Sequence, residues 1–179
     1  MNQGIVIGST TTTRDWLQNC LNSFGKYDRY PILVVINDDF EMGKLKWVYD
    51  HTDLDEIFLL HDTVEIKDTS LFDEAFGECA GKSFALSDHP AYMGMFLGKY
   101  RRDILKLMDI PLTRTKKEAV IQEDEFNRRY CNLEPHKVLL DPTLRNTDIF
   151  EDKFGRKNMV LENQYIKKYK GTWAWEMVP

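Results

Sequence analysis

The sequence predicts an α/β fold with a mostly parallel sheet and helices on both of its faces. Three short apolar runs, at residues 4–10, 31–36 and 56–60, have the composition of buried strands. Segments whose apolar residues recur every three or four positions lie between and after these runs, and this spacing is typical of amphipathic helices. Right-handed crossovers join such alternating strands and helices, which makes the strands parallel neighbours in one sheet.

The chain has enough residues for one well-packed core. Its 179 residues are 42% hydrophobic, and dividing them would leave two small cores. No internal repeat, low-complexity tract or linker interrupts the sequence. We therefore expect one domain over residues 1–179, in which residues 150–179 form a basic, aromatic closing segment.

Amphipathic spacing, capping residues and helix-ending residues predict the positions of the first three helices. The first is predicted over residues 16–24, with Thr13 as its N-cap and Gly25 as its stop. A weaker amphipathic segment covers residues 41–50. Residues 71–79 repeat the spacing of the first helix, and a hydroxyl residue just before them is the expected cap.

The second half of the chain is less regular. Residues 83–87, 91–97 and 137–140 have the pattern of strands, and residues 99–108 and 122–130 have that of helices.

Composition excludes several classes of protein. The formal net charge of −5 argues against a dedicated nucleic-acid binder, because such proteins carry a basic excess. No apolar run approaches the ~18 residues of a membrane span, and no basic cluster follows Met1 as in a targeting signal. Cysteines without CxxC spacing suit neither a disulfide framework nor zinc. Cys20 and Cys79 are expected in the core, in a cytoplasmic protein with reduced thiols.

Polar side chains follow each of the three predicted strands of the first half. Hydroxyl residues including Ser9, Thr10 and Thr11 follow the first strand, and Asp38 and Asp39 follow the second. The third strand runs into a His-Asp-Thr turn at residues 61–63. Ligands of an open α/β sheet bind beyond the carboxyl ends of its strands, so we expect these side chains to share one site.

In order and spacing these strand ends resemble the nucleotide-binding half of GT-A glycosyltransferases, a Rossmann-like fold, and above all the inverting family 2 group. The resemblance covers roughly residues 4–130. It implies that the hydroxyl loop, with Arg14 after it, and the acids Asp38 and Asp39 bind the nucleotide of a nucleotide-sugar donor. It also places His61 and Asp62 in the segment of the DxD motif, which binds metal and diphosphate.

The DxD segment is incomplete, because Asp62 is its one acid. The resemblance implies that Asp62 binds a divalent cation, Mn²⁺ or Mg²⁺, which prefer oxygen ligands. One carboxylate suffices only if phosphates and waters supply the other ligands. Metal dependence therefore stays open at the level of sequence.

A second part of the resemblance concerns the acceptor. Residues 91–105 are similar to the family's small-residue strand and the acceptor-side helix after it, and residues 122–129 resemble the ED motif that opens a helix. In the family an acid of this motif deprotonates the acceptor hydroxyl. Asp124 is the predicted base and Glu123 the alternative; an acidic helix start is also favourable simply through the helix dipole.

The C-terminal segment is strongly basic, with six basic residues and one acid between positions 153 and 170. In similar enzymes a mobile element closes over the donor at this place in the chain. Arg156 and Lys157 are expected to pair with diphosphate oxygens, and Trp173 or Trp175 to stack on a sugar or base.

These features predict a glycosyltransferase that moves a sugar from a nucleotide-diphosphate sugar to an unidentified acceptor hydroxyl, by an inverting displacement. A nucleotidyltransferase is the alternative enzyme, although a glycine-rich basic loop is missing after the first strand. A non-catalytic sugar-nucleotide-binding protein is the third interpretation. The sequence has neither a P-loop nor a GxGxxG dinucleotide fingerprint.

Overall fold

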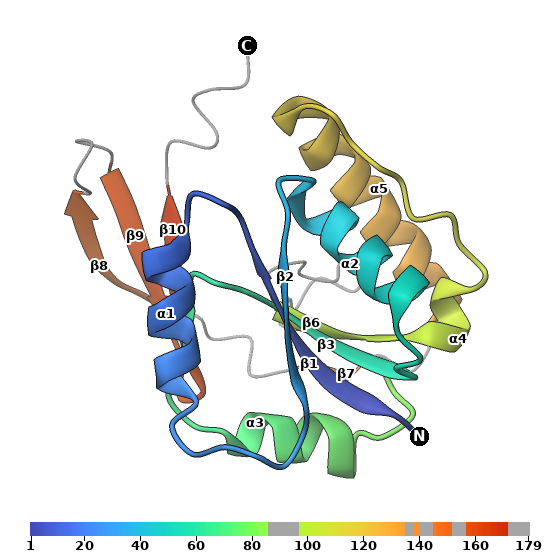
Figure 1. The fold of residues 1–179 in the computed structure, drawn as a ribbon, viewed down its shortest axis with the longest axis horizontal. Coiled ribbons are helices and arrows are strands. Elements are labelled where there is room, and N and C mark those ends of the chain that lie inside the picture. The colour runs from blue at the N-terminus through green and yellow to red at the C-terminus, as the bar shows by residue number, and fades with distance from the viewer. Residues whose placement is uncertain (86–96, 135–137, 140–144, 152–156, 172–179) are drawn as a thin grey trace.

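The computed structural model describes residues 1–85, 97–134, 138–139, 145–151 and 157–171, with the backbone alone for 138–139, 145–151, 157–159 and 170–171. A six-stranded sheet with strand order β2-β1-β3-β6-β5-β7 forms its centre (Figure 1). None of the helices in these ranges combines the length and apolar character that a membrane crossing needs.

The three strands of the first half are parallel, as predicted. β1 (Gln3–Ser9) lies between β2 (Ile32–Ile36) and β3 (Glu56–His61), and both pairings are parallel. The sheet continues through β6 (Leu97–Arg101), which runs antiparallel to β3 and to β5 (Phe84–Ala85). β7 (Val138–Leu139) pairs in parallel with β5. The predicted α/β fold with a mostly parallel sheet is confirmed.

Helices cover both faces of this sheet. On one face α1 (Arg14–Ser23) packs with α3 (Ser70–Asp73), which continues as the π-helical turn η1 (Glu74–Glu78). The other face carries α2 (Phe40–His51), α4 (Arg102–Leu105) and α5 (Lys116–Leu133). Figure 1 shows α5 lying beside α2.

A smaller antiparallel sheet has the strand order β4-β10-β9-β8 and lies next to α1 (Figure 1). Its strands are β4 (Val64–Ile66), β10 (Ile166–Gly171), β9 (Lys157–Glu162) and β8 (Arg145–Glu151). Much of the predicted closing segment therefore belongs to a sheet, because the backbone of β10 pairs with the short strand that follows β3.

Two predictions for the second half were wrong in their boundaries. Residues 99–101, expected in a helix, belong to β6 because Lys99 and Tyr100 are buried on opposite faces of the sheet. The Lys99 ammonium lies 3.2 Å from Glu56 Oε2 and donates to the Cys79 carbonyl. The helix expected from residue 122 begins at Lys116 instead, where a capping box between Thr115 and Glu118 starts it. Only Leu97 of the predicted strand 91–97 is described.

Two expectations for buried residues had different outcomes. Cys20 and Cys79 lie in the core, as their spacing predicts. β2 was predicted to be fully buried, but it forms an edge of the sheet. Val34 and Ile36 are consequently 38% and 51% exposed.

Gly43 allows the turn after β2 to approach α2 closely. A Cβ at Gly43 would lie 2.3 Å from Asp39 Cβ, whereas one at Gly77 would meet nothing within 4 Å. We expect Gly43→Ala to lower the free energy of unfolding by roughly 1–3 kcal/mol through overpacking. Gly77→Ala, the control, is expected to raise it by roughly 0.4–1 kcal/mol. Urea denaturation measures both, and equal effects would contradict the close packing.

Candidate functional site

The polar residues at the ends of β1, β2 and β3 form one hydrogen-bonded cluster. Ser9 Oγ donates to Asp62 Oδ2 over 2.8 Å, and the Thr13 hydroxyl donates to the same oxygen. The backbone N–H and the hydroxyl of Thr11 donate to Asp38, at 3.2 and 3.1 Å. The loop after β1 thus connects the acid after β2 to the acid after β3.

The remaining predicted residues of this edge lie around the cluster. Thr10 Oγ1 is 2.9 Å from Thr13 Oγ1. Arg14 is the exposed first residue of α1, and Asp39 is the exposed residue before α2. Phe40 follows with φ = 43°, in the left-handed region that residues other than glycine seldom adopt. Such strain is concentrated at functional sites, and here it lies beside the predicted nucleotide-binding acids.

Lys44 adds a buried ammonium group that the sequence analysis missed. Its side chain, 3% exposed, crosses β1 at Gly8, where a Cβ would lie 2.5 Å from Lys44 Cδ. Burial lowers the pKa of Lys44, while the carboxylates of Glu41 and Asp62 act to raise it. A lysine among the apolar residues of the predicted helix 41–50 was the one sequence signal for this group.

His61 and Glu41 form a contact on the side of the cluster that faces α2. His61 Nε2 lies 3.3 Å from Glu41 Oε1. Burial lowers the pKa of His61 to about 3, so the imidazole is neutral at pH 7. Burial acts to raise the pKa of Glu41, whereas His61 when protonated, Lys116 and Lys44 act to lower it. Glu41 is therefore an ionised carboxylate next to a neutral imidazole.

The two acids of the ED segment lie in different environments within α5. Glu123 is partly buried, and burial followed by the negative charge of Glu41 raises its pKa to about 7. Asp124 is exposed and forms an ion pair with Arg128 over 2.5 Å. Since α5 begins at Lys116, both acids lie in the middle of a helix and not at its start. The pKa of Glu123 is therefore in the range that suits an acid–base group near neutral pH.

The C-terminal strand β10 brings Lys168 to the turn after β3. Lys168 is 6% exposed; its Nζ donates to the Thr63 hydroxyl and lies 3.5 Å from His61 Nδ1. The backbone N–H of Tyr169 donates to the Thr63 carbonyl, so the strand itself holds the ammonium in place. Lys157 belongs to β9, but its side chain lies outside the described residues, as do Arg156, Trp173 and Trp175.

The groups around Asp62 are a poor match for a divalent cation. The described residues contain no group of three or more His, Cys, Asp or Glu side chains that could hold a metal ion. Of the motif residues, His61 contacts Glu41, and Thr63 holds an ammonium. Hard divalent cations need several oxygen ligands and are repelled by neighbouring positive charge.

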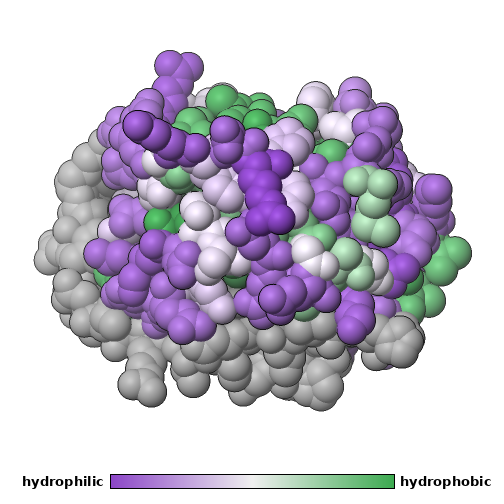
Figure 2. Space-filling model, turned by 90° about the horizontal axis from the view of Figure 1, so that it is seen from below, coloured by the Kyte–Doolittle hydropathy of each residue, from purple (hydrophilic) through white to green (hydrophobic). Residues whose placement is uncertain are grey.

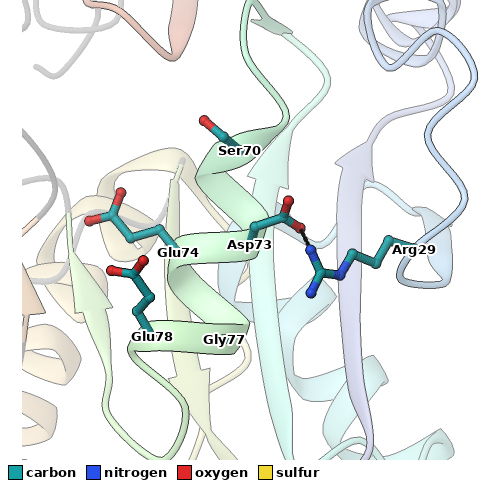
Figure 3. A pocket seen from close by; sticks show the side chains of 6 residues that line it. All are labelled: Arg29, Ser70, Asp73, Glu74, Gly77 and Glu78. Carbon is teal, nitrogen blue, oxygen red and sulfur yellow. Dashed lines mark ion pairs between the residues drawn. The ribbon is translucent and has the colours of Figure 1, made fainter.

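A separate polar pocket lies at the amino end of the sheet. It has a volume of 690 Å³ and is lined by Arg29, Ser70, Asp73, Glu74, Gly77 and Glu78 (Figure 3). Gln3, the first residue of β1, contacts the Phe76 carbonyl nearby, which places the pocket far from the strand ends that carry Asp38 and Asp62. The surface on the α3 side of the molecule is mostly hydrophilic (Figure 2).

Comparison with known proteins identifies the fold. No family model and no curated protein matches this chain. Among solved structures, TarS 1–349 of S. aureus, a glycosyltransferase, is similar with a TM-score of 0.58 and 14% identity, over 78% of this chain and 58% of TarS 1–349. A197 from STIV is similar with a TM-score of 0.54 and 12% identity, over 94% of each chain. The chain has the mixed α/β fold of these structures, and it spans 35% of a longer TarS structure.

The raised pKa of Glu123 predicts how stability depends on pH. A carboxyl that titrates near 4.5 when unfolded and near 7 when folded binds its proton more tightly in the folded state. The free energy of unfolding of the wild type, relative to Glu123→Gln, should fall as the pH rises from about 4.5 to about 7 and then level off. Urea denaturation across this range measures it. A difference that does not change with pH would contradict the environment described for Glu123.

Proposed function

We propose that this protein is a glycosyltransferase that moves a sugar from a nucleotide-diphosphate sugar to an acceptor hydroxyl. The observation that carries the proposal is the joining of Ser9, Asp38 and Asp62 into one polar cluster at the carboxyl ends of β1, β2 and β3. Ligands of such sheets bind at this edge. Because the fold is similar to that of a glycosyltransferase, a nucleotide-sugar donor is the expected ligand of this edge.

The donor's nucleotide is assigned to the exposed part of the cluster. Asp38 and Asp39, whose carboxylates are exposed, accept hydrogen bonds from the ribose or base. Thr10, Thr11 and Arg14 line the same loop and offer hydroxyl and guanidinium donors. Ser9 and Thr13 act through Asp62, because they hold its carboxylate in one orientation.

Glu123 is the proposed general base, in preference to Asp124. The acceptor oxygen attacks the anomeric carbon as the bond from that carbon to the diphosphate breaks, and Glu123 accepts the acceptor's proton. A base with a pKa near the working pH is suited to this step. Glu123 meets that condition at about 7, and its neighbours Glu41, Lys116, Asp124 and Lys168 set the value together with burial.

The nucleotidyltransferase alternative has less support. Enzymes of that class begin with a glycine-rich, basic loop after the first strand. Here the loop after β1 consists of threonines, and the one basic residue near it is Arg14.

Nucleotide release tests the proposal. Purified protein is incubated with UDP-, GDP- and dTDP-sugars and with lysate as acceptor, and the released nucleotide is measured. Release from one donor is the expected result. Binding of a nucleotide sugar with no release from any donor would favour the non-catalytic binding protein instead.

Isosteric variants of the two ED acids test the base. We expect Glu123→Gln to bind donor normally and to lose transfer by about 100-fold or more, because glutamine cannot accept the proton. The wild-type rate should rise with pH up to about 7, the pKa of Glu123, and then level off. Asp124→Asn is the matched control and should keep most of its activity. The reverse pattern would assign the base to Asp124.

A further inference from the structure

A lysine occupies the place where the DxD resemblance expects a metal ligand. The third position of that segment is Thr63, a hydroxyl in place of a carboxylate. The Lys168 ammonium donates to this hydroxyl, so a positive charge is already present at the motif. The His61 imidazole, 3.5 Å away, is a second neutral group beside the same ammonium.

The fold fixes this ammonium firmly. β10 pairs with β4 in the register Lys168 to Val64, and the Tyr169 N–H donates to the Thr63 carbonyl over 2.9 Å. Lys168 is buried, which restricts its side chain to few conformations.

Lys44 supplies a second cation to the same cluster from the opposite element, α2. It crosses β1 at Gly8, next to the strand end that carries Ser9, and it interacts electrostatically with Asp62. Asp62 is thus one carboxylate, already hydrogen-bonded by two hydroxyls, near the Lys44 ammonium. At Thr63 itself the Lys168 ammonium repels a divalent cation and attracts the oxygens of a phosphate group.

We propose that Lys168, assisted by Lys44, binds the donor's diphosphate and takes over the role of the divalent cation, so that donor binding and transfer need no metal. The proposal rests on the proposed glycosyltransferase function. Two ammonium groups can neutralise a diphosphate through charge-assisted hydrogen bonds. They can also stabilise the negative charge that develops on the leaving nucleoside diphosphate as the sugar–oxygen bond breaks.

Binding in the presence of a chelator is the first test. Calorimetry measures the binding of UDP, GDP, dTDP and inorganic pyrophosphate to the wild type, in EDTA and again with Mn²⁺. We expect at least one nucleoside diphosphate to bind equally well in both. If binding occurs only with Mn²⁺, the inference is overturned while the glycosyltransferase proposal stands. If no nucleoside diphosphate or nucleotide sugar binds under either condition, both fail.

Lys168→Met is the second test, with its neighbour Lys167→Met as the matched control. In EDTA, loss of a charge-assisted contact should weaken nucleoside diphosphate binding by roughly 10- to 100-fold and leave binding of the matching nucleoside unchanged. Lys167 lies next to Tyr169, so its variant should bind as the wild type does. Equal diphosphate affinity of the two variants would overturn the inference.

Thr63→Asp tests the role of Lys168 even if Lys168→Met does not fold, because this variant retains the buried lysine and changes only a turn residue. A carboxylate here neutralises the Lys168 charge, so diphosphate binding in EDTA should weaken by roughly tenfold or more. Wild-type affinity of Thr63→Asp in EDTA would contradict the role of the ammonium.

Discussion

The Asp62 carboxylate, with the Ser9 and Thr13 hydroxyls on one of its oxygens, is the contact around which the polar edge of the sheet is organised. It joins the loop after β1 to the end of β3, and Thr11 extends the same loop to Asp38. Because Asp62 is 7% exposed, these hydrogen bonds also replace the water that its carboxylate loses on folding.

Buried and partly buried charges from three elements lie around this contact and shift one another's pKa. α2 brings Glu41 and Lys44, α5 brings Glu123, and β10 brings Lys168. Glu41 contacts His61 and raises the pKa of Glu123. The pKa of each of these residues depends on its burial and on its charged neighbours as well as on its residue type. The same group of residues contains the proposed base, Glu123, and the cations Lys44 and Lys168.

The closing segment shows how a local pattern changes meaning in a fold. Its basic residues predict a mobile element that closes over an anionic ligand. In the structure, β9 and β10 are instead strands of a second sheet. Backbone pairing with β4 holds β10 against the end of β3. Lys168, which no pattern singled out, is thereby placed next to Thr63.

The sequence by itself determined the parallel strands β1, β2 and β3, the helices between them and the polar residues at their ends. Such features depend on periodicity and on turn residues close together in the chain. The tertiary structure decided that β2 is an edge strand, that Lys99 lies in a strand and that α5 begins at Lys116. It also distinguished Glu123 from its neighbour Asp124 and brought Lys44 and Lys168 to the site. These outcomes depend on burial and on pairing between distant segments, and neither is encoded in local spacing.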